Sequence, residues 1–147
     1  MLNEIQGNLF HSKDIVWAHQ VNARSVMGSG IAKQIREEFP NVFEEYVNSR
    51  MKLGDCLVVP TIYKGKNIYI ANLCGQKDFG REKRRYTDYG GLLKAMSKFF
   101  DWLNQNNINS FSTVRIGCGS GNGDWAIVKQ MLQSFAQDNF TITVYNL

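Results

Sequence analysis

Residues 111–123 read FSTVRIGCGSGNG, and residues 124–138 continue as DWAIVKQMLQSFAQD. The segment 111–116 is apolar and β-branched, which predicts a strand. In 124–138 the apolar residues recur three and four positions apart, which predicts a helix. Four glycines in the seven residues 117–123 separate the two elements. A strand, a glycine loop and a helix in succession favour an α/β protein that binds a ligand at one edge of its sheet.

The rest of the chain alternates between strand and helix patterns in the same way. Pro40 should end one helix, and Asn41 is expected to cap the next. Several strands are apolar almost throughout, as expected when helices cover both faces of a sheet. We therefore predict a single domain, residues 1–147, with an α/β layer fold in which helices cover both faces of a central sheet. Its other predicted strands are 14–21, 55–62, 67–73 and 140–145, and its other predicted helices are 31–39, 41–50 and 90–104.

The composition limits the class of protein. A chain of 147 residues with 44% hydrophobic and 20% charged residues can bury a core, which excludes a disordered protein. The net charge of +4 favours an anionic partner. The three cysteines lie far apart without metal-binding spacing, so we expect no disulfide, no metal and a cytoplasmic location. No apolar run approaches membrane-spanning length, and we expect a monomer without a cofactor or a membrane partner.

Two glycine loops are candidates for a binding site. Met27-Gly28-Ser29-Gly30 follows a strand and opens a helix at Ile31, an arrangement that turns backbone N–H groups toward an anion. Its spacing matches neither GxGxxG nor a P-loop, so alone it favours a plain tight turn. The loop 117–123 is the stronger signal, because such backbone freedom costs stability unless a ligand approaches the main chain. At the carboxyl ends of strands in an open sheet, the two loops would meet at one crevice.

Four segments of the sequence carry a family resemblance: Gly7-Asn8-Leu9-Phe10, the strand 15–22 running into residues 27–32, the loop 115–119 with Trp125, and the closing residues 144–147. Together they resemble the macrodomain family, a three-layer α/β/α module with a central mixed sheet that binds ADP-ribose. They span the chain in the family's order, and jointly they are specific. Within the family, the chain is most similar to a branch with the terminal ADP-ribose protein glycohydrolase, the ADP-ribose 1''-phosphate phosphatase and many short prokaryotic and phage proteins.

The resemblance implies a site for ADP-ribose or an ADP-ribosylated macromolecule. The two loops would enclose the diphosphate and the distal ribose, with Asn22 near that ribose and Tyr145 and Leu147 beside the adenine. The family usually has Asp at the position of Asn8, where the carboxylate accepts from the adenine amino group. Asn8 keeps an acceptor oxygen without the charge, so a weaker hydrogen bond is expected. The implied binding residues are Asn8, Leu9, Asn22, Met27, Gly28, Ser29, Gly30, Ile31, Gly117, Cys118, Gly119, Ser120, Gly121, Asn122, Gly123, Tyr145 and Leu147.

The resemblance also implies a hydrolase that removes ADP-ribose from a macromolecule or phosphate from ADP-ribose 1''-phosphate. The alternative is a module that reads or sequesters ADP-ribose without turnover. In the glycohydrolase branch, a lysine attacks the distal ribose and an aspartate in the last glycine loop resolves the intermediate. This chain has Gln76 at the lysine position and Gly121 at the aspartate position, with Lys77 and Asp124 displaced along the chain. The candidate catalytic residues are Asp124, Lys77, Gln76 and Asn22.

Each reactive side chain also has a structural interpretation. Asp124 can be a base or a helix cap, and the cap is favoured. Lys77 is expected at the surface rather than as a nucleophile, and Gln76 can position a water but cannot act as a base. Cys118 is expected to serve packing rather than nucleophilic chemistry. His19 alternates away from the pocket, which predicts a buried core histidine.

The positive charge concentrates in residues 77–85, KDFGREKRR. We favour a solvated loop for this run. A contact for the diphosphate or for an ADP-ribosylated macromolecule comes second. A nucleic-acid patch with Phe79 and Tyr86 as stacking residues is third, because one short basic run carries no recognised binding motif.

Overall fold

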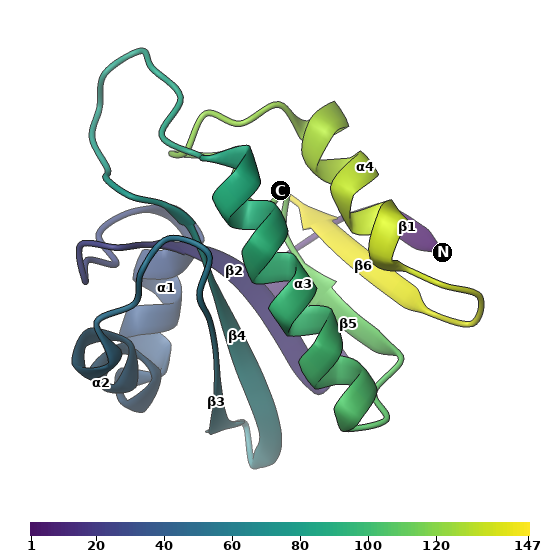
Figure 1. Ribbon diagram of the computed structural model, residues 1–147. Coiled ribbons are helices and arrows are strands. Elements are labelled where there is room, and N and C mark those ends of the chain that lie inside the picture. Colours follow the sequence, from purple (N-terminus) through teal and green to yellow (C-terminus); the bar gives the residue numbers. More distant parts are fainter.

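The computed structural model describes residues 1–147, and a six-stranded sheet forms its centre (Figure 1). The strand order is β1-β6-β5-β2-β4-β3. All neighbours pair in parallel except β3, which runs antiparallel to β4. The mixed sheet predicted from the sequence is therefore confirmed. The strands are β1 (Leu2–Gln6), β2 (Val16–Asn22), β3 (Cys56–Tyr63), β4 (Lys66–Gln76), β5 (Ser110–Thr113) and β6 (Thr141–Asn146).

Helices cover both faces of this sheet. Helices α1 (Gly30–Glu38) and α2 (Pro40–Ser49) lie on one face, and α3 (Tyr89–Gln105) and α4 (Trp125–Phe135) lie on the other (Figure 1). A short 3-10 helix, η1 (Leu9–His11), follows β1. The three-layer α/β/α prediction is thus confirmed. None of the helices has the length and apolar character needed to cross a bilayer.

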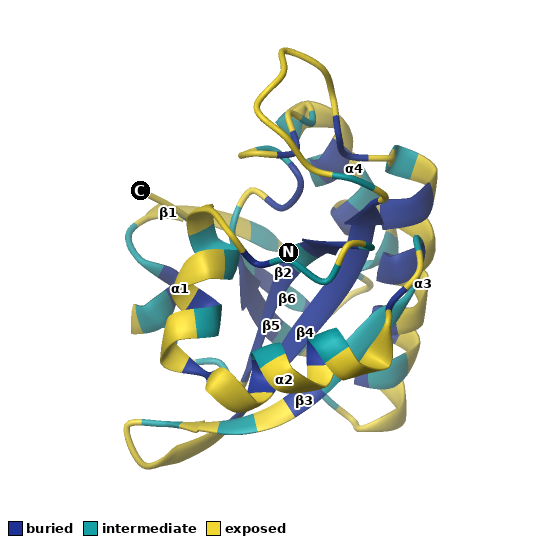
Figure 2. Cartoon of the chain, turned by 90° about the vertical axis from the view of Figure 1, so that its left-hand side faces the viewer, coloured by how far each residue is buried: buried dark blue, intermediate teal, exposed yellow.

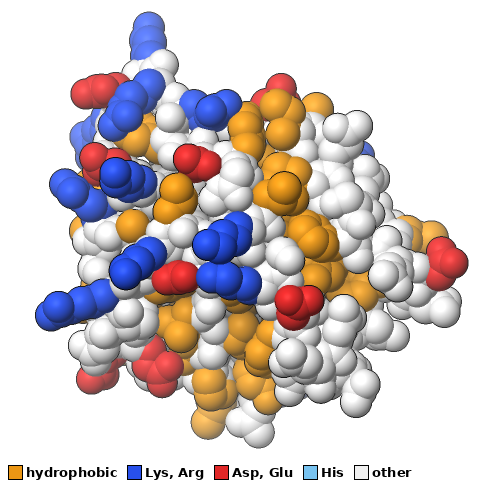
Figure 3. Space-filling view, in the orientation of Figure 1, with side chains coloured by type: hydrophobic (Ala, Val, Ile, Leu, Met, Phe, Trp, Pro, Cys, Tyr) orange, Lys and Arg blue, Asp and Glu red, His pale blue; other side chains and the backbone are white.

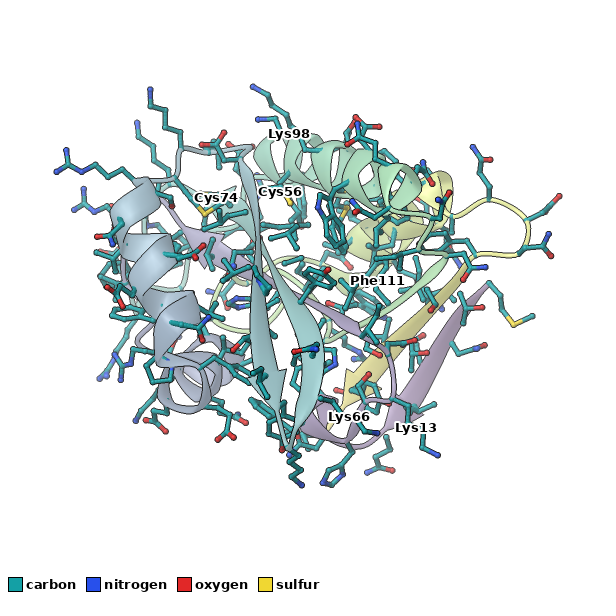
Figure 4. The ribbon with its side chains drawn as sticks, turned by 90° about the horizontal axis from the view of Figure 1, so that it is seen from below. Lys13, Cys56, Lys66, Cys74, Lys98 and Phe111 are labelled. Atoms are coloured by element: carbon teal, nitrogen blue, oxygen red, sulfur yellow. The ribbon has the colours of Figure 1, made fainter.

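The central strands β5, β2 and β4 are buried between the two helical layers (Figure 2). Side chains of β2 alternate between the layers, as the period of a strand requires. Ala18 joins the core beneath α3 and α4, whereas Trp17 joins the core beneath α1 and α2. Phe111 of β5 also packs beneath α3 and α4 (Figure 4). Cys56 and Cys74, on neighbouring strands, are free thiols (Figure 4), as is Cys118.

The structure differs from the predicted elements in a few places. Strand β1 was not predicted, because its residues are mostly exposed at a sheet edge and show no apolar alternation. Strand β5 ends at Thr113 rather than at residue 116, since the chain there turns toward the glycine loop. The prediction that Asn41 caps the second helix was wrong. That helix begins at Pro40, and the Asn41 side chain instead bonds to Pro60 O and Thr61 Oγ1 on β3.

The sheet topology determines where a ligand can bind. The carboxyl ends of β6, β5, β2 and β4 lie at one edge, because these strands are parallel. The loops after β2 and β5 lead into α1 and α4 at that edge. A bulge between Val21 and Asn22 turns the end of β2 out of register with β4. Both glycine loops therefore start from neighbouring strands at the same side of the sheet.

Candidate functional site

A cavity of about 890 Å³ opens at the carboxyl edge of the sheet. Both glycine loops line it, as do the segment before η1 and the C-terminal residues. The two loops also touch, since Ser29 Oγ lies 3.0 Å from Ser120 Oγ. The expected single crevice is present. The predicted residues that line it are Asn8, Leu9, Asn22, Gly28, Ser29, Gly30, Ile31, Gln76, Gly117, Cys118, Gly119, Ser120, Gly121, Gly123, Tyr145 and Leu147.

Asn22 at the end of β2 holds the turn that leads to the first loop. Its Oδ1 accepts from Arg24 N at 2.9 Å, and its Nδ2 donates to Val26 O at 2.8 Å. The Tyr46 hydroxyl donates to Asn22 O at 2.6 Å and to its Oδ1 at 3.0 Å. Burial raises the pKa of Tyr46 to about 12, so the hydroxyl keeps its proton for these bonds. Asn22 lines the cavity, but its side-chain oxygen and nitrogen already form hydrogen bonds that hold the loop.

The first loop presents unpaired donors to the cavity. The amide N–H groups of Gly28, Ser29, Gly30 and Ile31 donate no hydrogen bond within the protein. Gly30 adopts φ +57°, a conformation that a side chain would strain, and it begins α1. The positive end of this helix therefore lies at the cavity, where an anion would be stabilised.

The second loop is held against residues 86 and 87. Gly121 O accepts from both Tyr86 N and Thr87 N at 2.9 Å, and Thr87 Oγ1 donates to Gly117 O at 2.7 Å. A Cβ added at Gly121 would lie 2.2 Å from Thr87 Oγ1 and 2.8 Å from Gly117 O. The amides of Gly119, Ser120 and Gly121 donate no hydrogen bond within the protein. The glycine at position 121 thus lets Thr87 pack closely against the loop, while the amides of residues 119–121 stay without a partner in the protein.

A network of side-chain amides forms part of the cavity wall. Gln20 Nε2 donates to Gln76 Oε1 at 2.7 Å and to Thr87 Oγ1 at 3.0 Å. Gln76 Nε2 donates in turn to Asp78 O at 2.8 Å. Gln20 Oε1 is buried without a partner. Gln20 was missing from the predicted site, although its position two residues before Asn22 places it on the same face of β2.

Two of the candidate catalytic residues do not line the cavity. Asp124 is exposed and its Oδ1 accepts from Ala126 N at 2.9 Å, which confirms its role as the cap of α4. Lys77 is exposed at the end of β4, as expected for a surface charge. The residues that line the cavity include no Asp, Glu, Lys or His. The lining therefore offers backbone donors, side-chain amides and the guanidinium groups of Arg81 and Arg115.

Four further predicted residues have clear positions. Met27 is fully buried behind the first loop, and the Asn122 side chain donates to Arg84 O, so neither lines the cavity. Cys118 does line it, but burial raises its pKa to about 11, which keeps the thiol protonated. His19 is fully buried, with Nε2 2.6 Å from Asn72 Oδ1, and burial lowers its pKa to about 4. The histidine is therefore neutral in the core, as predicted, and its Nδ1 has no partner.

The opposite end of the cavity lies beside β1 and β6. Asn8, Leu9 and Val114 line it together with Tyr145 and Leu147. The Tyr145 ring lies beside the main chain, since a Cβ built at Gly7 would be in ordinary van der Waals contact with its Cδ1 at 3.5 Å.

Arg115 and Trp125 also line the cavity, although the sequence assigned them no contact with the ligand. The Arg115 guanidinium lies 5.9 Å from the centre of the Trp125 ring, and the Trp125 indole N–H donates to Glu4 at 2.8 Å. Hydrogen bonds from Lys129 and Trp125 hold the pKa of Glu4 below its ordinary value. Glu4 Oε1 also lies 3.5 Å from Arg115 Nη2, so this carboxylate contacts both side chains at the cavity rim.

A basic loop, residues 77–85, forms another part of the rim. Phe79, Gly80 and Arg81 line the cavity. Lys and Arg side chains gather over this part of the molecule, at the upper left of Figure 3. Arg84 and Arg85 lie over aromatic rings, 4.3 Å from the Tyr86 centroid and 4.2 Å from the Tyr89 centroid. The charge is therefore partly fixed in place next to the cavity mouth.

The sequence of this chain is similar to those of known proteins. The family model of the Macro domain matches residues 18–132. The chain belongs to the macrodomain family. Among relatives of this macrodomain, the human ADP-ribose glycohydrolase OARD1 is 30% identical over 145 residues, which cover 97% of this chain and 90% of that protein.

Solved structures show the same macrodomain fold. The macrodomain of Mycobacterium tuberculosis DarG superposes with a TM-score of 0.87 at 24% identity, covering 100% of this chain and 98% of that one. DarTG of Thermosipho africanus, solved in complex with ADP-ribose, gives a TM-score of 0.84 at 16% identity. That match covers 99% of this chain and 42% of the other. At these identities the likeness shows the fold of the macrodomain alone.

Proposed function

We propose that this macrodomain binds the ADP-ribose group in its cavity and hydrolyses an ADP-ribose derivative. The observation that carries the proposal is the pair of glycine loops, because seven residues with unpaired backbone N–H groups and the start of α1 line one cavity. A diphosphate needs such converging donors, and no charged side chain is required to hold it. A relative of similar length is named an ADP-ribose glycohydrolase, and a structural neighbour holds ADP-ribose.

The order of the strands supports one direction for the ligand. Tyr145 and Leu147 at β6 would lie beside the base, while the loops after β5 and β2 enclose the diphosphate. The distal ribose then lies near β2 and β4, where Asn22 and Gln76 line the cavity. In this orientation the distal ribose, where the reaction takes place, would lie beside the network of side-chain amides.

The chemistry of the lining favours particular leaving groups. Hydrolysis at the anomeric carbon passes through an oxocarbenium-like state, in which the bond to the leaving group breaks while water forms the new C–O bond. A carboxylate or a phosphate departs as a stable anion without a proton from the protein. Because no Asp, Glu, Lys or His lines the cavity, we propose substrates of this kind. Gln76 Nε2 and Asn22 Nδ2 each use one of their two hydrogens within the protein, and the second N–H of each would orient the water, whose proton would pass to solvent.

The basic loop, residues 77–85, would contact the macromolecule to which ADP-ribose is attached. It carries five Lys or Arg residues against Asp78 and Glu82, and it borders the cavity mouth. Interactions of exposed cations with a polyanion weaken steeply with salt. Binding of an ADP-ribosylated polyanion should therefore depend on salt much more than binding of free ADP-ribose.

We further propose that residues 1–147 act as one domain and as a monomer, because one chain supplies the whole lining of the cavity. The free thiols suit a reducing compartment, so we propose a cytoplasmic location.

A second candidate function is a reader or sequestering module without turnover. The specific observation in its favour is the absence of an acid or base in the lining, together with the cap role of Asp124. Both functions need the same binding site, so binding alone does not separate them.

One panel of assays tests both functions. ADP-ribose binding is measured by calorimetry, and the protein is then incubated with ADP-ribose 1''-phosphate, with protein ADP-ribosylated on carboxylates, and with ADP-ribosylated DNA. The proposed hydrolase releases ADP-ribose from one of the first two substrates. Binding without product on every substrate would leave the reader function, and absence of binding would refute both.

A further inference from the structure

The two glycine loops meet at a contact between two serine side chains. Ser29 Oγ lies 3.0 Å from Ser120 Oγ, close enough for one hydroxyl to donate a hydrogen bond to the other. Both serines line the cavity, and both are exposed to solvent, so they belong to its outer wall. Val21 and Asn22 also line the cavity, but they are buried and form its floor. The contact therefore closes part of the outer wall opposite this floor.

Ser29 lies at a position where a serine ordinarily has a different partner. It is the N-cap residue of α1, with extended backbone angles of φ −150° and ψ 162°, yet its side chain accepts no hydrogen bond from the helix. A serine N-cap usually accepts from an amide of the first turn, which stabilises the helix by about 1 kcal/mol. Here the amides of Gly30, Ile31 and Ala32 have no partner in the protein. The contact with Ser120 thus keeps the Ser29 hydroxyl away from amides whose residues line the cavity.

The Ser29 hydroxyl accordingly has two competing partners. Bonded to Ser120, it closes the wall; in another side-chain rotamer it would cap α1, and the wall would open. An anion bound to the first-turn amides occupies the donors that this cap needs. Ser120 then remains as the partner of the Ser29 hydroxyl. Binding of an anion therefore favours the closed arrangement.

We propose that Ser29 and Ser120 form a clasp that closes over the diphosphate of a bound ligand and opens to admit or release it. The inference rests on the proposed binding of ADP-ribose. A diphosphate held by the amides of both loops would lie beneath the clasp, with a nucleoside on one side of it and a ribose on the other. These bulky groups hinder the ligand from sliding out while the wall is closed. Exchange of the ligand then requires the contact between the two hydroxyls to break.

A disulfide in place of the clasp tests the proposal. Because the two oxygens are 3.0 Å apart, the sulfurs of the double variant Ser29→Cys with Ser120→Cys reach the bond length of about 2.05 Å after a small movement of the loops. One sample is oxidised empty and another after loading with ADP-ribose. Peptide mass spectrometry establishes that the bond joins positions 29 and 120 rather than either of them with Cys118. The same samples after reduction are the matched control.

The oxidised empty protein should take up ADP-ribose at least about tenfold more slowly than the reduced protein, and the oxidised loaded protein should retain it through gel filtration. Equal exchange before and after reduction would overturn the clasp while the binding function stands. Failure of the disulfide to form between positions 29 and 120 would contradict the contact itself.

A single substitution tests the clasp without a covalent bond. Ser120→Ala removes one hydroxyl, so the association and dissociation rates of ADP-ribose in stopped-flow fluorescence should both rise about 3- to 10-fold, the effect of one hydrogen bond. Ser97→Ala, at an exposed position of α3 away from the cavity lining, should leave both rates unchanged. Equal rates for the two variants would overturn the clasp. Absence of ADP-ribose binding by the unchanged chain would overturn the proposed function and this inference with it.

Discussion

Replacing Gly121 by alanine should damage both stability and binding. The added Cβ would lie 2.2 Å from Thr87 Oγ1, 2.8 Å from Gly117 O and 3.0 Å from Gln20 Nε2. Gly117 O is a main-chain atom, so relief requires the loop itself to move. That movement pulls Gly121 O away from Tyr86 N and Thr87 N, both now at 2.9 Å.

The magnitude follows from those contacts. Overpacking of this kind costs about 1–3 kcal/mol, and weakening two backbone hydrogen bonds adds about 1 kcal/mol. We therefore expect Gly121→Ala to lower the free energy of unfolding by about 2–4 kcal/mol in urea denaturation. Displacement of the loop also misaligns its unpaired amides, so ADP-ribose affinity should fall at least about tenfold in calorimetry.

Gly119→Ala is the matched control within the same loop. Nothing lies within 4 Å of a Cβ built at Gly119, and its φ is not in the left-handed region. Its unfolding free energy should stay within about 0.5 kcal/mol of the unchanged chain. Equal stability of the two alanine variants would refute the claim that packing against Thr87 shapes the loop.

Three further predictions concern residues around the site. Because burial lowers the pKa of folded His19 to about 4, the unfolded chain takes up its proton first as the pH falls below about 6.5. The free energy of unfolding should therefore drop by up to about 3 kcal/mol between pH 6.5 and 4. In His19→Gln the free energy of unfolding, measured by urea denaturation, should fall less steeply over that pH range. An equally steep fall in the variant would contradict the buried neutral ring. Asp124→Ala removes a helix cap and should cost about 1 kcal/mol in urea denaturation while leaving turnover intact; lost turnover at unchanged stability would instead make Asp124 catalytic. Tyr46→Phe removes the donor to Asn22 O and Oδ1, which should cost about 1–3 kcal/mol and weaken ADP-ribose binding through the first loop, and calorimetry showing normal affinity would argue against that coupling.

The sequence predicted the layers and the cavity because both depend on local patterns. The alternation of apolar strands with amphipathic helices is visible without tertiary contacts, and glycines at 117–123 signal close approach of the backbone. Strand β1 escaped prediction, since the polar residues Asn3 and Glu4 interrupt any apolar alternation at the sheet edge and the pairing with β6 spans almost the whole chain. Pairing across such a separation leaves no local pattern.

The finer features of the site also depend on long-range contacts. Thr87 packs under the second glycine loop, and Gln20 bonds to Gln76 across 56 positions. The sequence near these residues gives no indication of these contacts. The oxygen of Asn8 was expected to be available to a ligand, but the structure engages it with Phe10 N. A side chain's donor or acceptor character toward a cavity depends on which of its atoms the protein has already used.

The most direct test of the central claim is an NMR titration of backbone amides with ADP-ribose. We predict that the largest chemical-shift changes fall on the unpaired amides of both loops, Gly28–Ile31 and Gly119–Gly121, and saturate together with one affinity. Saturating shifts confined to other surfaces, or no shifts at millimolar ligand, would contradict the assignment of the cavity as an ADP-ribose site.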